Sequence, residues 1–112
     1  MTPETIGQLQ LDVYNARDLQ RFMACYGDQI QVFRPPAPEP VLAGKVAFAE
    51  YYATQRFNRP GLHAQLVNRM VLGRRIIDHE RIVGVGDQPL EMAVVYEVVD
   101  GVIGIVWGFA AV

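Results

Sequence analysis

The hydrophobic positions of this chain follow a helical period in its first half and a strand-like pattern in its second half. Ile6, Leu9 and Val13 are spaced as on one face of a helix, which predicts a helix over Pro3 to Asn15. Proline suits the opening turn of a helix because its missing N–H needs no partner there. The pattern breaks immediately afterwards, so this helix stands alone at the start of the chain.

The next segment predicts a short helix, a short strand, a loop and a third helix. Asp18 is a suitable N-cap for a helix that runs to Gly27. Alternation at 30–32 predicts a strand, and the proline-rich stretch 34–40 excludes both a helix and a central strand. The apolar stripes of residues 44–57 predict the third helix.

Four strands are predicted after the third helix, at 62–72, 76–85, 90–99 and 102–112. The dipeptide Asp100-Gly101 between the last two runs favours a two-residue hairpin turn, because a type I′ turn needs positive φ at both central residues. Helices followed by an antiparallel meander indicate an α+β fold, with the helices covering one face of a curved sheet.

The hairpin turn predicts the register of the last two strands and therefore which side chains share a face. It pairs Val95 with Val106 and Tyr96 with Ile105. We expect a face with little side-chain volume, which leaves room for a ligand, and a bulky face, which a second subunit covers. If the two faces are exchanged, the bulky residues are core and Trp107 becomes a wall of the cavity. The two faces consist of Val95, Gly104, Val106 and Gly108, and of Tyr96, Ile105, Trp107 and Phe109.

The hairpin at 62–85 carries the densest group of polar residues. A three-residue turn at 73–75 pairs Met70 with Asp78 and Asn68 with Glu80, whereas a two-residue turn places Arg69 opposite Asp78. We favour the three-residue turn, because it gathers apolar residues, two carboxylates and an amide on one face and groups the cations on the other.

Asp78, His79 and Glu80 are the candidate catalytic residues. A carboxylate among leucine, methionine and isoleucine side chains is desolvated, which raises its pKa toward the value that an acid or base at neutral pH requires. His79 suits proton transfer at physiological pH. The alternative is that both carboxylates pair with arginines, and that His79 is a surface or interface residue.

Aromatic residues of the helices and of the first strand are the candidate walls of a cavity. Buried tyrosine hydroxyls need partners, which water or a ligand in a cavity provides, although ordinary core packing explains each ring taken singly. Arg34 either attracts an acidic ligand or remains a solvated loop residue. The expected ligand-binding residues are Tyr14, Phe22, Tyr26, Phe33, Tyr52, Asn68 and Trp107.

Composition narrows the class of protein. The chain of 112 residues is expected to form one domain, 1–112, and its net charge of −2 makes nucleic acid an unsuitable partner. No apolar run approaches the ~18 residues of a membrane span. No signal peptide is visible, and the single cysteine, Cys25, cannot form an internal disulfide, so we expect a cytoplasmic protein. Neither metal-ligand spacing nor a cofactor motif is present, so no metal and no cofactor are expected.

The order of elements, with these residues, resembles the nuclear-transport-factor-2-like superfamily, and within it the SnoaL-like and ketosteroid-isomerase-like branch. The segments that carry the resemblance are LDVYNARDLQRFMACYGD (11–28), LAGKVAFAEYY (42–52), RRIIDHERIVG (74–84) and YEVVDGVIGIVW (96–107). The resemblance implies a cone-shaped, cystatin-like α+β fold, in which three N-terminal helices pack on a curved, mostly antiparallel sheet. It also implies an enclosed pocket and a homodimer formed through the sheet.

The resemblance does not extend to the residues of ketosteroid isomerisation. That chemistry uses a carboxylate base before a proline, a tyrosine on the first helix and a protonated aspartate on a late strand. The matching positions here hold Arg34, Gln10 (with Tyr14 one turn later) and Val94 or Val95. Arginine cannot act as a base at neutral pH. We therefore disfavour that mechanism.

The function expected from the sequence is a small-molecule pocket. It either serves an acid/base enzyme of the isomerase, lyase or hydrolase type that acts on a hydrophobic substrate, or belongs to a non-catalytic ligand-binding or dimerisation module. The sequence alone does not separate these alternatives, because one fold hosts many chemistries.

Overall fold

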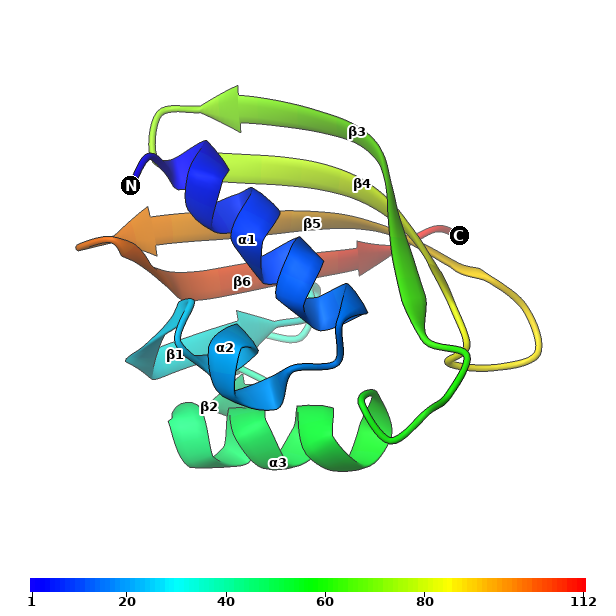
Figure 1. The fold of residues 1–112 in the computed structure, drawn as a ribbon. Helices are drawn as coiled ribbons and strands as arrows, with labels where there is room; N and C mark the ends of the chain where they lie inside the picture. The colour runs from blue at the N-terminus through cyan, green and yellow to red at the C-terminus, as the bar shows by residue number, and fades with distance from the viewer.

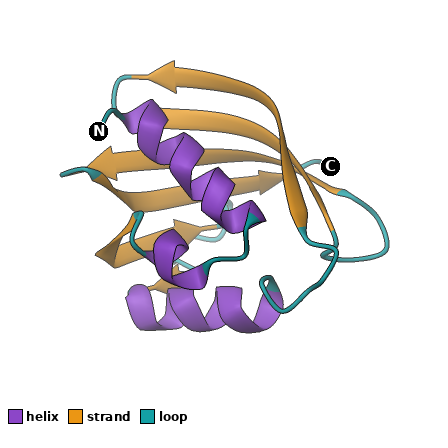
Figure 2. Cartoon of the chain, viewed as in Figure 1, coloured by secondary structure: helices purple, strands orange, loops and turns teal.

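Three helices lie on the concave side of a curved six-stranded sheet in the computed structural model, which describes residues 1–112 (Figures 1 and 2). The helices are α1 (Pro3–Asn15), α2 (Leu19–Met23) and α3 (Lys45–Gln55). The strands are β1 (Tyr26–Phe33), β2 (Leu42–Ala43), β3 (His63–Leu72), β4 (Arg75–Val83), β5 (Leu90–Val99) and β6 (Val102–Ala110). The α+β fold with three helices on a mostly antiparallel sheet is therefore confirmed.

The strands follow the order β2-β1-β6-β5-β4-β3. All neighbouring strands are antiparallel except β1 and β6, which pair in parallel. Because β6 lies between β1 and β5, it joins the first part of the chain to the C-terminal meander. The helix α1 crosses β3, β4 and β5, while α3 lies against β1 and β2 (Figure 1).

The predicted helix over residues 3–15 is confirmed, and local chemistry explains its start. The Thr2 hydroxyl accepts a hydrogen bond from the Thr5 N–H at 3.1 Å, which satisfies one of the free donors of the first turn. The Asp18 carboxylate caps α2 in the same way by accepting from the Arg21 N–H at 3.1 Å. However, α2 ends at Met23, four residues earlier than predicted, because Tyr26 pairs with Ile103 and begins β1.

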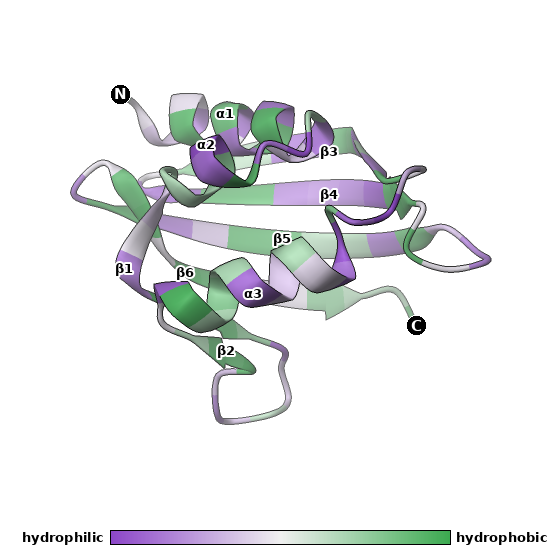
Figure 3. Ribbon diagram, turned by 60° about the horizontal axis from the view of Figure 1, so that its bottom comes forward, coloured by the Kyte–Doolittle hydropathy of each residue, from purple (hydrophilic) through white to green (hydrophobic).

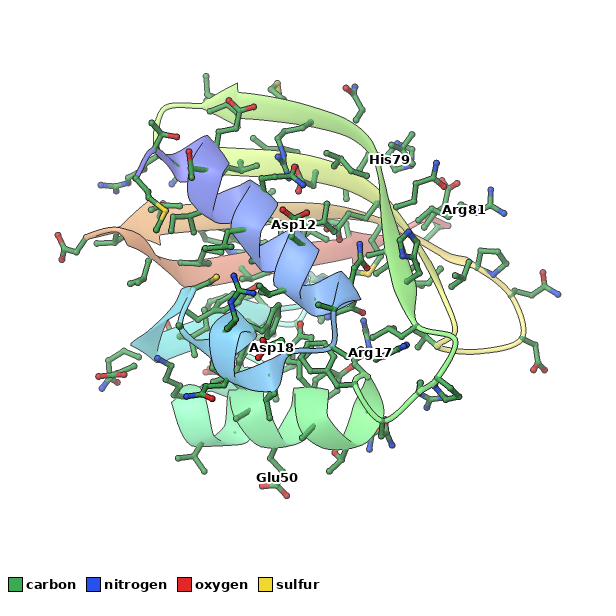
Figure 4. The ribbon with its side chains drawn as sticks, viewed as in Figure 1. Asp12, Arg17, Asp18, Glu50, His79 and Arg81 are labelled. Carbon is green, nitrogen blue, oxygen red and sulfur yellow. The ribbon has the colours of Figure 1, made fainter.

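The end of α1 and the residues that follow it tie the helices to the start of β3 and to the loop before it. The Asn15 side chain donates to the Ala64 carbonyl at 2.9 Å and accepts from the Ala64 N–H at 2.8 Å. The Arg17 guanidinium donates to the Pro60 carbonyl at 2.8 Å, beside the loop that follows α3 (Figure 4). These bonds hold the 56–62 segment against the helices.

The register predicted for the last hairpin is wrong beyond its turn. Val98 pairs with Ile103 as expected, but Glu97 then pairs with Ile105, because a bulge leaves Gly104 without a direct partner. The bulge shifts the later pairs by one residue, so Tyr96 lies opposite Val106. Tyr96 therefore faces the helices and Val95 faces away, the reverse of the prediction. The predicted faces are correct for four residues of β6, namely Val106, Ile105, Trp107 and Phe109.

The register favoured for the middle hairpin is also wrong, and the alternative is correct. The turn consists of Gly73 and Arg74, and Gly73 has a φ of +60°, a conformation that glycine tolerates without strain. This two-residue turn places Arg69 opposite Asp78. A bulge between Leu66 and Asn68 then returns Leu66 to the face of Glu80 and leaves Asn68 on the other face.

The core fills the space between the helices and the concave face of the sheet. Its members that are almost completely inaccessible include Phe22, Phe48, Ile30, Ile76 and Ile103. Phe22 makes contact with several rings, and its ring lies parallel to that of Phe48 with centroids 5.8 Å apart. No helix combines the length and the hydrophobicity needed to cross a membrane.

Candidate functional site

A cavity lies between the helices and the concave face of the sheet. The centre of a water-sized sphere can move within about 40 Å³ of this cavity. All of the space between the lining atoms, including the opening to solvent, amounts to about 540 Å³. Its walls are mainly hydrophobic. The lining residues are Gln10, Leu11, Tyr14, Phe22, Tyr26, Val32, Arg34, Tyr52, Arg56, Ala64, Glu80, Ile82, Met92, Val94, Tyr96 and Val106.

Glu80 supplies the one carboxyl group among the residues that line this cavity. It is 5% exposed and accepts a hydrogen bond from the Tyr96 hydroxyl at 3.2 Å. Burial, reinforced by the negative charge of Asp78, raises the pKa of Glu80 to about 7. The polar stretch of β4 that contains it runs beside the mainly hydrophobic middle of β5 (Figure 3). Glu80 therefore lies in a setting where it can both donate and accept a proton near neutral pH.

Asp78 lies on the same face of β4 but does not line the cavity. It is completely buried, and the Arg69 guanidinium donates to both of its oxygens, at 2.7 and 2.9 Å. The same guanidinium donates to the Gln8 side chain at 2.9 Å, which links β3 to α1. The pairing with an arginine, one of the two alternatives drawn from the sequence, describes Asp78.

His79 is separated from the cavity by the alternation of β4. It is exposed on the opposite face of the sheet, and its Nε2 atom lies 3.0 Å from a carboxylate oxygen of Glu91 on β5 (Figure 4). Neither Asp78 nor His79 therefore faces the cavity directly, and the structure places only Glu80 of the three candidates there.

Four of the aromatic residues proposed from the sequence line the cavity, namely Tyr14, Phe22, Tyr26 and Tyr52. The Tyr26 hydroxyl donates to the Gln10 side chain at 3.0 Å. Burial, the largest influence on each, raises the pKa of Tyr14, Tyr26 and Tyr52 above the ordinary tyrosine value. These hydroxyls keep their protons at neutral pH and can act as hydrogen-bond donors.

Phe33, Asn68 and Trp107 do not line the cavity. Phe33 and Trp107 pair across β1 and β6 on the outer face of the sheet, where their nearly parallel rings lie 6.3 Å apart. Asn68 is exposed, and its side chain accepts a hydrogen bond from the Arg69 N–H at 2.9 Å. Asn68 differs from the prediction because of the bulge in β3. Phe33 and Trp107 differ from it because β1 and β6 direct their rings to the outer face of the sheet.

Arg56 is the main polar residue of the cavity that the sequence analysis did not single out. It follows α3, is only 6% exposed, and donates to the Tyr14 hydroxyl at 3.0 Å, while its Nε–H has no partner. Its spacing in the sequence could have indicated it, because Phe48, Tyr52 and Arg56 recur every four residues, as residues on one side of a helix do.

Arg34 and Gln10 complete the polar part of the lining. A Cβ at position 108 would lie 2.3 Å from a terminal nitrogen of Arg34, so Gly108 gives this guanidinium the space to lie against β6. Gln10 is buried, and its side-chain nitrogen has no partner. Arg34 therefore lies in the cavity wall and is not simply a solvated loop residue, and this position is compatible with attraction of an acidic ligand.

The positions that resemble the catalytic positions of ketosteroid isomerases lie around the cavity. Gln10, Arg34 and Val94 all contribute to its lining, whereas Val95 faces outward. The cavity therefore occupies the expected place, but these three positions lack the carboxylates and the tyrosine of that mechanism. The structure brings together no group of three histidine, cysteine, aspartate or glutamate side chains that could hold a metal ion.

Comparison with known proteins supports the fold and the family. The family model described as "SnoaL-like domain" matches residues 8–104. No curated protein has significant sequence similarity to the chain.

Solved structures of similar shape cover nearly the whole chain. A ketosteroid isomerase-like protein from Kribbella flavida has a TM-score of 0.84 and 20% identity, over 98% of this chain and 78% of that one. A SnoaL-like protein of unknown function from Burkholderia thailandensis has a TM-score of 0.82 and 18% identity, over 98% and 94% of the two chains. A computationally designed 17-OHP binder has a TM-score of 0.84 and 14% identity, over 100% and 94%. At these identities, the similarity establishes a shared fold.

Proposed function

The chain belongs to the SnoaL-like domain family, and we propose that its cavity binds a small, largely apolar molecule on which Glu80 acts as a general acid or base. The observation that carries this proposal is the position of Glu80. It is a buried carboxyl group in a cavity with mainly hydrophobic walls, and its pKa is raised to about 7. A group with that pKa is present in both protonation states at neutral pH, which suits proton transfer.

The donors around Glu80 suit a reaction that develops negative charge on an oxygen atom. Tyr14 accepts from Arg56, so its own proton is free to be donated, and the adjacent cation favours that donation. Donors that are already in place stabilise an oxyanion without reorganisation. A proton transfer at a carbon next to a carbonyl group fits this arrangement, with Glu80 moving the proton and Tyr14 facing the carbonyl oxygen.

The size of the cavity indicates a compact ligand. Since about 40 Å³ is open to the centre of a water-sized sphere, the space in this conformation corresponds to a few water molecules. Four tyrosine rings and Phe22 form much of the wall. A larger ligand requires movement of these aromatic side chains.

The test is the exchange of acidic C–H protons for deuterium in compact ketones, with cyclohexanone as the first probe, followed by NMR in D₂O. We expect the wild-type protein to accelerate exchange and Glu80→Gln to lose that acceleration while still binding the ketone. Glu91→Gln is the matched control, because Glu91 is a half-exposed carboxylate on the outer face of the sheet.

Two other outcomes distinguish the alternatives. Binding of the ketones without exchange in any variant would favour the non-catalytic ligand-binding pocket. No binding, together with an ordinary carboxyl pKa for Glu80 in an NMR titration, would overturn the proposal.

A further inference from the structure

Arg56 is a buried cation that has no anionic partner. Its side chain is among the few buried charged groups, yet none of the five ion pairs of the protein includes it. One of its nitrogen atoms donates to Tyr14, and its Nε–H has no partner. Buried charges are normally paired, because removing a charge from water is costly unless a counter-charge replaces the water. No side chain of the protein therefore supplies a counter-charge within ion-pair distance of Arg56.

We propose that the cavity selects a compact monocarboxylate, whose carboxylate group binds Arg56 and Tyr14 and whose apolar body lies against the sheet. This inference rests on the ligand-binding part of the function proposed above for the same cavity, not on proton transfer by Glu80, and it adds the chemical class of the ligand. A planar guanidinium and a planar carboxylate form paired, charge-assisted hydrogen bonds, which are stronger than bonds between neutral groups.

The other polar groups of the lining favour the same ligand. Arg34 is a second guanidinium of the lining that forms no ion pair, and the side-chain nitrogen of Gln10 is buried without a partner. The Tyr14 hydroxyl accepts from Arg56, and no acceptor is present for its own proton. The cavity thus offers a surplus of donors, which a ligand with acceptor oxygens satisfies.

The charges around the cavity leave room for one additional anion. Arg69 neutralises Asp78 through two hydrogen bonds, so that carboxylate does not compensate Arg56. Glu80 is the only carboxyl group among the lining residues, and Tyr96 already donates to it. Two guanidinium groups and one carboxyl group therefore face the ligand, and protonation of Glu80 removes the repulsion that a ligand carboxylate would meet.

The ligand's apolar body has a complementary surface in the apolar part of the lining. The apolar side chains there come from α1, β4, β5 and β6, and they are Leu11, Ile82, Met92, Val94 and Val106. A branched or cyclic acid of few carbon atoms combines the required charge with a body small enough for this space.

Isobutyrate and its neutral isostere isobutyramide provide a matched pair of probes. We expect calorimetry at pH 6 to show isobutyrate binding at least tenfold more tightly than isobutyramide, because a charge-assisted bond to Arg56 exceeds a neutral one. Arg56→Met should remove this preference and Arg56→Lys should retain part of it. Arg81→Met is the control, since Arg81 is exposed on the outer face of β4 (Figure 4).

The dependence on pH supplies a second readout that does not require a variant of Arg56 to fold. Affinity for isobutyrate should fall several-fold from pH 6 to pH 8 as Glu80 loses its proton, and Glu80→Gln should bind equally at both values. The titratable and charged groups that influence Glu80 from the surrounding elements are Asp78, Tyr96, Arg69, Arg56, Tyr26 and Tyr14.

The outcomes separate this inference from the proposed function. Equal binding of isobutyramide and isobutyrate by the wild-type protein would overturn the carboxylate preference and leave the cavity as a binding site for neutral molecules. Binding of neither probe would also overturn it, and the exchange experiment with cyclohexanone would then decide separately whether Glu80 acts on a neutral carbonyl compound.

Discussion

Glu80 combines three properties at the scale of a single residue: it is buried, it forms no ion pair, and it faces a cavity. Asp78, two positions away, is also buried but has a bidentate partner in Arg69. The two carboxylates illustrate how a neighbouring guanidinium decides whether a buried acid is part of the structural framework or is available for proton transfer.

The pH dependence of stability should reveal Glu80 directly. A pKa raised from 4.5 to about 7 means that the folded state holds this proton more tightly than the unfolded state. Stability from this group is therefore fully present below about pH 4.5 and is lost as the pH rises to about 7. The loss amounts to about 3 kcal/mol, at ~1.4 kcal/mol per unit of pKa.

Urea denaturation of wild-type protein and Glu80→Gln at pH 4.5 and pH 8 measures this effect. We expect Glu80→Gln to gain about 3 kcal/mol relative to the wild type on going from the lower to the higher pH. Glu91→Gln should show no such gain. Parallel changes in all three proteins would mean that Glu80 titrates as an ordinary carboxyl group.

Residue identity alone predicted part of the candidate site. A carboxylate among apolar residues of a strand drew attention to Glu80, and most of the aromatic residues selected on α1, α2 and β1 lie in the wall of the cavity. Arg56 was missed because an arginine near the end of a helix ordinarily points to solvent. Its burial depends on tertiary contacts, among them its hydrogen bond to the Tyr14 hydroxyl on α1.

At the scale of the elements, two bulges decide which side chains reach the cavity. One lies in β3 near Val67 and the other in β6 at Gly104, and each exchanges the faces of the residues beyond it. Turn chemistry predicts only the pairs next to a turn. The position of a bulge depends on how the whole sheet curves, which explains why helix bounds were predicted better than strand registers.

The close approach of the loops that contain Gly61 and Gly84 gives a prediction at this scale. Gly84 has a φ of +86°, and a Cβ there would lie 2.4 Å from the carbonyl carbon and oxygen of Gly61. Gly84→Ala should therefore destabilise the protein by more than ~2 kcal/mol, since both the backbone conformation and the contact become unfavourable.

Gly86→Ala provides the matched control, because a Cβ at that position meets no atom within 4 Å. We expect its free energy of unfolding to lie within ~0.5 kcal/mol of the wild type. Thermal and chemical denaturation measure both variants. Similar stability of Gly84→Ala and Gly86→Ala would show that the two loops do not approach each other this closely.

At the scale of the whole molecule, the outer face of the sheet is the main surface to which the proposals above assign no role. A row of apolar side chains crosses five strands there, through pairs that are directly opposite in register. The row consists of Met70, Ile77, Val95, Trp107 and Phe33. No helix covers this face, because α1, α2 and α3 all lie on the concave side (Figure 2).

We propose that this face pairs with the same face of a second copy, since a continuous apolar row is complementary to itself about a two-fold axis. Light scattering at micromolar concentration should give the mass of a dimer. Val95→Glu, at the centre of the row, should give a monomer, whereas Val46→Glu on the exposed side of α3 should remain dimeric. A monomeric wild-type protein would contradict the proposal.

The parallel pairing of β1 with β6 has a consequence for the order in which the chain can fold during translation. β1 leaves the ribosome early, yet its neighbour on one side begins at Val102, so this edge of β1 stays unpaired until almost the entire chain has been made. Until then β1 and β5 are both open edges, which are sites for unwanted pairing between nascent chains. Shortening the chain before β6 would thus separate the sheet into two unconnected parts instead of trimming one margin.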